Sequence, residues 1–273
     1  MLVTLLTDFG IADYFVGAMK GAILSVSPGA QIVDITHLIP PQDIEAGAFT
    51  LLAVYRDFPA DTIHVAVVDP GVGSSRRPLL VTGGGQFFIG PDNGIFGYVY
   101  EREAGARVYH LDREEFFHPS VSPTFHGRDV FAPVAGALSN GVEPAALGRE
   151  VSDYVRLSPL AARRSADAAS LDGAIIHIDR FGNCVTNLAR EPLTEEMIDG
   201  GARLILGEHE INSFRRFYAE AGATPGELFA IWGSAGLLEI AALNSSAARL
   251  LNAVRGQPVR LVRNPGRADA QEG

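Results

Sequence analysis

The chain has 273 residues, of which 47% are hydrophobic and 20% are charged, and its formal net charge is −10. This composition supports a large buried core in one or two domains. The net charge is negative and the basic residues are scattered along the chain, whereas nucleic-acid binding requires a basic face, so we expect no nucleic-acid partner. No apolar run approaches the ~18 residues of a membrane-spanning helix, so we expect no membrane association.

Two features predict a cytoplasmic location. The chain starts with a strand-like segment, residues 2–6, and shows neither a basic leader nor a small-residue cleavage site. Its single cysteine, Cys184, excludes an internal disulfide framework and suits a reducing compartment.

The first 160 residues alternate strand-like and helix-like segments. Apolar runs predict strands over residues 2–7, 31–35, 63–68, 79–82 and 87–89. Helical spacing of apolar residues predicts helices near residues 14–24, over 43–58 with Asp43 as the N-cap, and over 129–138. This alternation predicts an α/β domain with a mainly parallel sheet over residues 1–160.

The second half has a different organisation. Residues 161–170 lose periodicity and collect small, polar and charged side chains, so we interpret them as a linker. Turn signals then separate short strands at residues 174–179, 185–188, 203–206, 228–232, 237–241 and 258–262. Helical pieces intervene only near residues 191–198 and 212–221. This pattern predicts a smaller antiparallel, barrel-like β domain over residues 171–263 and a polar tail over 264–273.

The most informative segment is residues 69–77 (DPGVGSSRR), which follows the apolar strand at 63–68. Open α/β sheets bind their ligands where strands end. A carboxylate, Asp69, and a guanidinium, Arg76, at that place favour a catalytic role. A salt bridge that closes a glycine-rich loop explains the same spacing equally well.

The first half contains two further candidates. His126 lies between Phe125 and Gly127, which supply an aromatic wall and room for a ligand, although a structural histidine is the alternative. Asp8 follows the first strand, where a carboxylate can accept hydrogen bonds from a ribose diol or can cap a helix. No two of the seven histidines show the spacing of a zinc site, so we expect no metal. Together, Asp, Arg and His suggest activation of water without metal.

Two turns of the second half carry polar candidates. In residues 179–183 (DRFGN), Asp179 is suited to an ammonium group, Phe181 to stacking on a base and Asn183 to reading a purine edge. From spacing alone, an Asx-rich hairpin turn is the better explanation of this segment. Residues 233–239 (GSAGLLE) form a second tight turn whose glycines allow a flat ligand to approach the backbone, and a plain hairpin explains it equally well.

Taken together and in this order, the segments resemble the S-adenosyl-L-methionine (SAM) hydroxide adenosyltransferases, which are relatives of the fluorinase and chlorinase enzymes. The resemblance extends from about residue 2 to about residue 262. The matching segments are residues 7–10 (TDFG), 69–73 (DPGVG) with Arg76, 91–94 (PDNG), 125–128 (FHGR), 179–183 (DRFGN) with Thr186 and Asn187, and 233–239 (GSAGLLE).

The resemblance implies an N-terminal α/β domain, a C-terminal β-barrel-like domain and a homotrimer whose active sites lie between subunits. It implies SAM as the substrate and no cofactor. By position, Asp69, Arg76 and His126 match the residues that handle the water nucleophile. Asp8 matches the residue that holds the ribose hydroxyls, and Asp179 matches the one that binds the methionine ammonium. The full set of substrate-binding positions implied is Asp8, Asn93, Phe125, Gly127, Asp179, Phe181, Asn183, Ser234 and Glu239.

Departures from the halogenases indicate which nucleophile is used. Their halide pocket resembles a Phe-Tyr-Ser-Arg segment whose serine hydroxyl contacts the halide, and this chain has Gly127 there. They carry a tyrosine before a proline where this chain has Asp69, whose carboxylate would repel a halide. Gln42 stands at the position where the fluorinase pattern has a tryptophan that forms one wall of the pocket. We therefore expect hydrolysis of SAM to adenosine and L-methionine by attack of water on the ribose 5′ carbon. A SAM-dependent halogenase and a non-catalytic SAM or adenosine sensor are the alternatives.

Overall fold

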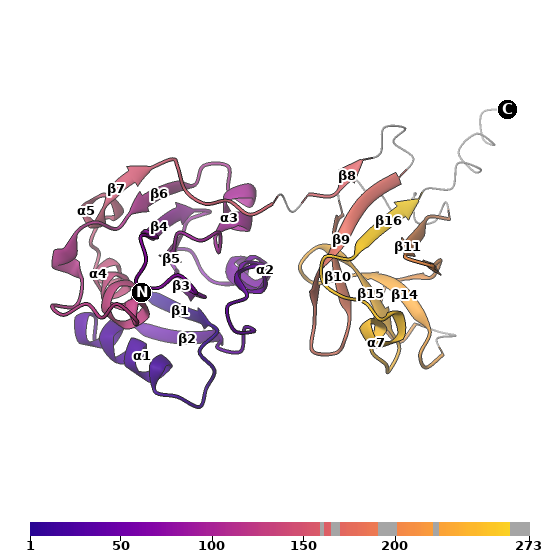
Figure 1. Cartoon of the computed structure of the whole chain (residues 1–273), viewed down its shortest axis with the longest axis horizontal. Helices are drawn as coiled ribbons and strands as arrows, with labels where there is room; N and C mark the ends of the chain where they lie inside the picture. The colour runs from indigo at the N-terminus through magenta and orange to yellow at the C-terminus, as the bar shows by residue number, and fades with distance from the viewer. Residues whose placement is uncertain (159–160, 165–169, 191–200, 221–223, 263–273) are drawn as a thin grey trace. The chain divides into compact units, whose positions relative to one another are not determined.

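The computed structural model describes residues 1–158, 161–164, 170–190, 201–220 and 224–262. The chain divides into two compact units, Met1–Pro159 and Leu160–Gly273, and each unit has its own sheet (Figure 1).

The first unit is built on a seven-stranded sheet. In spatial order its strands are β2 (Gln31–Thr36), β1 (Leu2–Thr7), β3 (Ile63–Val67), β5 (Gln86–Pro91), β4 (Pro78–Gly83), β6 (Arg107–His110) and β7 (Arg149–Val151). The first four are parallel to one another, and each later strand pairs antiparallel with its neighbour. Strand β6 runs in the same direction as the first four strands, because β4 is antiparallel to both β5 and β6. The expected α/β unit with a mainly parallel sheet is therefore confirmed.

Helices cover this sheet on both sides (Figure 1). Helices α1 (Phe15–Val26) and α4 (Ala132–Ser139) pack against each other and share a core with Val3 and Leu5 of β1. Helices α2 (Ile44–Val54) and α3 (Gly97–Arg102) form a second contacting pair. The remaining short helices are η1 (Tyr55–Asp57), η2 (Glu114–Phe116), η3 (Gly127–Phe131) and α5 (Pro144–Leu147).

Local sequence signals explain where these helices begin. The Asp43 carboxylate accepts a hydrogen bond from the Ala46 N–H at 3.0 Å, so the predicted N-cap of α2 is confirmed. The predicted helix at 129–138 differs in detail, because it starts at Gly127 with a turn of π-helix (η3) before α4. A π-helical turn is rare in proteins and is frequently found at functional sites.

The second unit contains a nine-stranded sheet. In spatial order its strands are β12 (His209–Ile211), β11 (Arg203–Leu206), β16 (Pro258–Val262), β9 (Ser170–Ile178), β10 (Cys184–Ala189), β15 (Leu237–Ala242), β14 (Leu228–Trp232) and β13 (Phe214–Arg215), with β8 (Arg163–Arg164) also paired to β9. Strand β9 pairs with β16 along its first half and with β10 along its second half, so the sheet curls around its own core (Figure 1). Every pairing except β13 with β14 is antiparallel, which confirms the predicted barrel-like β architecture.

Three sequence predictions for this half differ from the structure or fall outside it. The helix expected near residues 212–221 is wrong, since residues 212–220 form β13 and turns. The helix expected near 191–198 lies outside the described residues. The segment interpreted as a linker contains β8, and the sequence analysis missed helix α7 (Ala247–Leu251). Among the described residues, no helix is both long and apolar enough to cross a membrane.

Candidate active site

The first group of candidate residues lies at the carboxyl end of the parallel strands. Strands β1 and β3 are neighbours, with Thr7 in register with Val67, so the segments that follow them start at the same edge of the sheet. Both strands are almost completely buried, which fixes the positions of Asp8 and Asp69. Asp8 Oδ2 accepts a hydrogen bond from the Gln42 backbone N–H at 2.8 Å. Gln42 has a left-handed backbone conformation, with a φ of 67°.

Asp69 and Arg76 form a buried, bidentate ion pair. Arg76 Nε donates to Asp69 Oδ1 at 3.0 Å, and Arg76 Nη2 donates to Asp69 Oδ2 at 2.5 Å. The Asp69 side chain is 4% exposed and that of Arg76 is 8% exposed. Two parallel charge-assisted hydrogen bonds fix the plane of the guanidinium as well as its position. The salt bridge considered from the sequence is therefore present, and it orients both groups.

His126 joins this pair through Arg76. Its Nδ1 lies 2.7 Å from Arg76 Nη2. A guanidinium can only donate, so Nδ1 accepts, and neutral His126 carries its proton on Nε2. Burial lowers the pKa of His126, and the positive charge of Arg76 lowers it further. The three residues predicted from the sequence as the catalytic set are thus in direct contact.

One end of the Arg76 guanidinium is left for a ligand. Nε and Nη2 are engaged by Asp69 and His126, and the guanidinium lies 5.4 Å from the centre of the Phe131 ring. Its Nη1 is buried and has no hydrogen-bond partner among the residues that the structure describes. A buried donor without a partner is costly, so this nitrogen indicates a place for a bound acceptor.

Glycine allows the loop after β3 to approach the loop that carries His126. Gly73 has a φ of +78°, and a Cβ there would lie 2.2 Å from the Pro123 carbonyl oxygen. Any other residue at this position would therefore combine backbone strain with a steric clash. This close approach brings together segments that are about 50 residues apart in the sequence.

Phe125 and Gly127 lie in a tightly packed aromatic cluster. The Phe125 ring contacts Phe9 and Phe15 edge-on, with centroid distances of 6.0 and 5.3 Å. A Cβ on Gly127 would lie 3.2 Å from Met19 Sδ and 3.3 Å from the Phe125 ring. The position that carries a serine in the halogenase pattern is therefore closely surrounded here.

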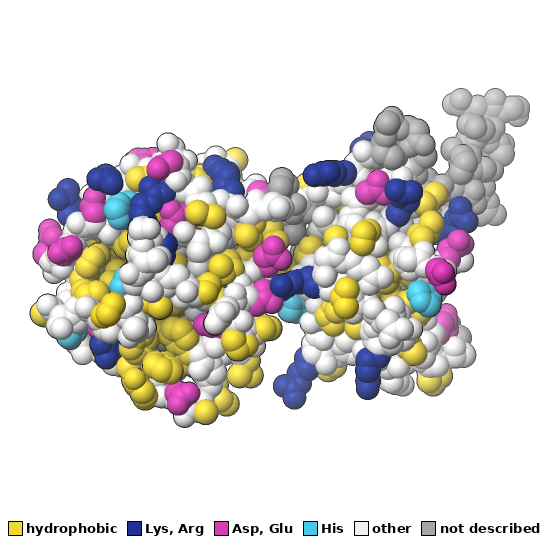
Figure 2. Space-filling view, viewed as in Figure 1, with side chains coloured by type: hydrophobic (Ala, Val, Ile, Leu, Met, Phe, Trp, Pro, Cys, Tyr) yellow, Lys and Arg dark blue, Asp and Glu magenta, His cyan; other side chains and the backbone are white. Residues whose placement is uncertain are grey.

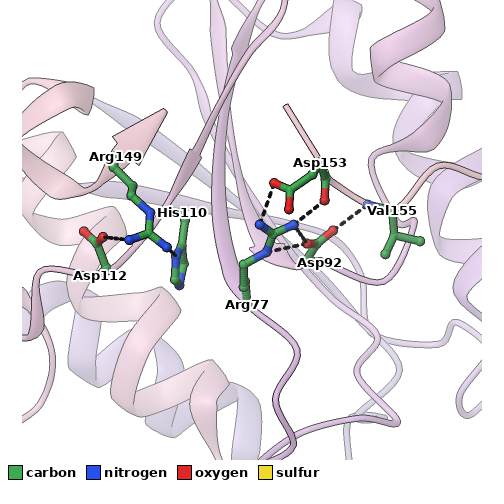
Figure 3. A network of polar contacts seen from close by, with 7 residues as sticks. All are labelled: Arg77, Asp92, His110, Asp112, Arg149, Asp153 and Val155. Atoms are coloured by element: carbon green, nitrogen blue, oxygen red, sulfur yellow. Dashed lines mark hydrogen bonds and ion pairs between the residues drawn. The ribbon is translucent and has the colours of Figure 1, made fainter. Parts of the chain in front are cut away.

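Asn93 bonds to the backbone of its own turn and to that of the segment before Asp69. Its amide Nδ2 donates to the Val68 carbonyl at 2.8 Å, and its Oδ1 accepts the Ile95 N–H at 3.2 Å. Asn93 thus holds the residue before Asp69. The neighbouring Asp92 accepts hydrogen bonds from Arg77 and from the Val155 N–H, in a network shown in Figure 3.

The second unit holds the other candidates, starting with an Asx-type turn at residues 179–183. Asp179 Oδ1 accepts the N–H groups of Phe181 at 2.9 Å and Asn183 at 2.8 Å, and its Oδ2 accepts the Asn183 side-chain amide at 2.8 Å. Gly182 completes the turn with a φ of +84°. The hairpin turn favoured from spacing is present, and it displays Phe181, which is 78% exposed.

The Asx turn is connected to Glu239 through a residue that the sequence analysis missed. Asn183 Nδ2 lies 3.3 Å from Tyr218 Oη, which in turn donates to Glu239 Oε2 at 3.4 Å. Burial raises the pKa of Glu239, and the nearby charge of Asp179 raises it further. Its carboxylate fits only because Gly233 has no side chain, since a Cβ there would overlap Glu239 Oε1. Ser234 is exposed in the same turn.

Tyr218 was missed because the segment around it was interpreted as a helix. The sequence feature that could have indicated Tyr218 is the pair of consecutive aromatic residues, Phe217 and Tyr218, in a polar stretch. Both residues are exposed in the structure. Across the described part of the chain, no three His, Cys, Asp or Glu side chains are grouped as a metal site would need.

Comparisons with known proteins show which proteins this chain resembles. The chain is 36% identical to an (R)-S-adenosyl-L-methionine hydrolase of Thermus thermophilus, over 94% of this chain and 98% of the relative. It is 35% identical to a protein of the same name from Methanocaldococcus jannaschii, over 92% of each chain. A fluorinase of Actinopolyspora mzabensis is more distant, at 25% identity over 96% of this chain and 97% of the relative.

A solved structure and two family models also match the chain. An uncharacterised conserved protein of Thermotoga maritima matches with a TM-score of 0.87 and 31% identity, over 96% of this chain and all of that one. Residues 3–148 match the N-terminal domain model of the SAM hydroxide adenosyltransferases, and residues 173–260 match the C-terminal one. The chain therefore belongs to the SAM hydroxide adenosyltransferase family.

Proposed function

We propose that this protein hydrolyses SAM to adenosine and L-methionine. The observation that carries the proposal is the connected Asp69–Arg76–His126 set, in which the Asp69–Arg76 pair is buried and Arg76 Nη1 is left as an unused donor. The names of the SAM hydrolase relatives support the same substrate. SAM is the substrate, and the proposed reaction requires neither a cofactor nor a metal.

In this reaction the oxygen of water attacks the ribose 5′ carbon in line with the sulfur. A C5′–O bond forms, the C5′–S bond breaks, and the bonding electron pair remains on sulfur. The sulfonium becomes a neutral thioether, so the leaving group needs no proton. The nucleophile is the difficult partner, because bulk water has a pKa of ~15.7.

The geometry assigns a role to each member of the catalytic set. Arg76 Nη1 is the donor suited to hold the water oxygen and to stabilise developing negative charge. Neutral His126 carries its proton on Nε2 while Nδ1 accepts from Arg76, so it serves as a donor to the water. Asp69 remains as the proton acceptor, and each of its oxygens keeps a second acceptor position beside its bond to Arg76.

The remaining candidates are assigned to substrate binding. Asp8 is suited to the ribose hydroxyls, and its bond from Gln42 N–H orients it. Asp179 supplies negative charge for the methionine ammonium, Glu239 is a further candidate for lining the same site, and Phe181 offers an exposed ring for adenine. Asn183, Ser234, Phe125 and Gly127 complete the proposed binding set.

The proposal includes a homotrimer in which each active site takes residues from two subunits, and a cytoplasmic location. An exposed apolar surface supports subunit association. Hydrophobic side chains gather on the face of the first unit seen in Figure 2. The exposed large hydrophobic residues of this unit include Ile11, Tyr14 and Leu38. These residues are close in sequence to Asp8 or Gln42. The single cysteine supports the reducing compartment.

Two alternatives make different predictions. A halogenase is disfavoured because the Asp69 carboxylate would repel a halide and Gly127 supplies no hydroxyl. A non-catalytic sensor is disfavoured because the catalytic set is assembled with an unused donor.

The test is incubation of the purified protein with SAM in ¹⁸O-labelled water, with and without chloride, followed by mass spectrometry of the nucleosides. The two epimers at sulfur are assayed separately, since the relatives are named for the (R) form. Labelled adenosine with methionine is the expected product, and Asp69→Asn is the matched control. A 5′-chloro nucleoside would identify a halogenase, and binding of SAM without turnover would identify a sensor.

A further inference from the structure

A dipeptide at the end of β5, Asp92-Asn93, holds both ends of the loop that carries Asp69 and Arg76. Asn93 Nδ2 donates to the Val68 carbonyl at the start of the loop. At the other end, Arg77 Nε and Nη2 donate to Asp92 Oδ2 at 3.0 and 2.7 Å. Two neighbouring residues directly after β5 therefore fix the separation of the two loop ends.

A second segment, residues 153–155, secures this contact (Figure 3). Arg77 Nη1 donates to Asp153 Oδ1 at 2.8 Å, and Arg77 Nη2 donates to the Asp153 carbonyl at 2.5 Å. The Val155 N–H donates to the second oxygen of Asp92 at 2.8 Å. Both carboxylate oxygens of Asp92 are thus bonded, and the Asp92 side chain is buried.

The chemistry of this cluster favours a positioning role over a purely stabilising one. A buried ion pair contributes little net stability, because removing two charges from water costs about as much as their attraction returns. A bidentate guanidinium contact does fix geometry. Arg77 follows Arg76 directly in the chain, so the contact that orients Arg77 also constrains the backbone of Arg76.

We propose that Arg77 and Asp92 are positioning residues that hold the Arg76 guanidinium against His126 and at the site of the attacking water. This inference rests on the proposed hydrolysis for its kinetic consequence. Its structural consequence, the Arg76–His126 contact, does not depend on the substrate.

The test uses the full-length variants Arg77→Lys and Asp92→Asn. Lysine keeps the charge but cannot make the bidentate contact, and asparagine keeps the shape of aspartate without its charge. A displacement of the catalytic group by about 1 Å lowers rates by up to about 10²-fold, so we expect kcat to fall between about 10-fold and 10²-fold. The KM for SAM is expected to stay within about twofold, because the binding residues do not move.

A titration of the His126 imidazole by NMR gives the second readout. When Arg76 moves away, its charge no longer lowers the pKa of His126, so that pKa should rise in both variants. Asp69 and Asp129 also act on this imidazole, and both remain in the variants. A role in stability alone would leave the His126 titration of the folded variant unchanged.

Glu150→Gln is the matched control, since it breaks the exposed Arg107–Glu150 pair between β6 and β7 without touching the loop. It should leave kcat and the His126 titration as in the wild type. Unchanged kcat and His126 titration in both test variants would overturn the proposal. If Asp92→Asn does not fold, Arg77→Lys decides alone. A wild-type protein that does not turn over SAM would refute the proposed function, and the titration would still test the positioning role.

Discussion

Arg76 connects the other two members of the proposed catalytic set, Asp69 and His126. Three of its five N–H donors are directed at Asp69 and His126, and the two on Nη1 are left. Its orientation is set by the two parallel bonds to Asp69, and it in turn fixes the His126 tautomer. The chemistry proposed for each residue therefore follows from a single guanidinium.

Asp69→Asn should lower turnover far more than it weakens binding. The amide cannot accept the proton of water, and the loss of one acid–base group typically costs ~10²–10⁴-fold in rate. Steady-state kinetics and calorimetric titration with SAM measure the two effects separately. Thermal denaturation checks that the variant is folded, and parallel losses of kcat and affinity would contradict the role of proton acceptor.

The activity should fall on the acid side as His126 becomes protonated. Because the pKa of His126 lies below its ordinary value of about 6.5, we expect the acid limb of kcat below that pH. Protonated His126 cannot accept from Arg76, and it adds a positive charge next to it. The unfolded chain takes up this proton more readily, so stability should also fall as pH drops from about 6.5 through the lowered pKa.

The measurement is a pH–rate profile of the wild type alongside His126→Asn, which should lack this titration. His209→Asn, at an exposed position on β12, is the matched control and should retain it. An acid limb that is identical in all three proteins would assign the titration to another group.

Among the elements, the π-helical turn η3 has the most direct effect on the site. It follows His126 immediately, and Gly127 begins it against Met19 and Phe125. In the second unit, the Asx turn at 179–183 likewise positions a candidate residue, because backbone N–H groups hold the Asp179 carboxylate. In both places an irregular piece of backbone displays polar side chains at the end of a regular element.

Gly127→Ser should destabilise the protein and slow the reaction without changing the product. The new Cβ would lie 3.2 Å from Met19 Sδ, and overpacking of this kind costs about 1–3 kcal/mol. His126 would be displaced, so kcat should fall. Since Asp69 remains, no 5′-chloro nucleoside should form in chloride, as checked by mass spectrometry.

Gly21→Ala on α1 is the matched control for a glycine substitution. A Cβ at Gly21 meets no atom within 4 Å, and alanine in an exposed helix interior should stabilise the protein by about 0.5–1 kcal/mol. Chemical denaturation measures both variants. Equal stability changes for Gly127→Ser and Gly21→Ala would show that the surroundings of Gly127 are not close-packed.

At the scale of the whole molecule, the candidate residues are divided between the two units. The proposed catalytic set belongs to Met1–Pro159, and the group of Asp179, Asn183, Tyr218 and Glu239 belongs to Leu160–Gly273. Each group is held by contacts within its own unit. The proposed activity requires both.

Mixed oligomers test whether the two groups meet between subunits. Asp69→Asn and Asp179→Ala should each be inactive or weak alone, the first in turnover and the second in binding. When they are co-expressed, random assembly of a symmetric ring should pair intact halves at about one quarter of the sites, and activity should reappear. Activity no higher than the sum of the separate variants would place both halves of a site in the same subunit.

Much of the fold was predictable because its signals are local. The strands at 203–206, 228–232 and 258–262 and the Asp43 cap follow from patterns within a few residues, and the structure matches them. The helix expected near 212–221 is absent, and Phe217 and Tyr218 of this segment are exposed in the structure. Periodicity cannot show which way a side chain faces.

The sequence by itself determined the class of fold, the two-part organisation and the identity of the candidate residues, because each depends on residue type and order. Only the tertiary structure decided that Asp69, Arg76 and His126 are in contact, that Nη1 is left over, and that Tyr218 links Asn183 to Glu239. It also showed that Asn93 and Arg77 hold the two ends of the loop that carries Asp69 and Arg76. These contacts join residues far apart in the chain, and their geometry follows from strand order and close packing, which no local pattern encodes.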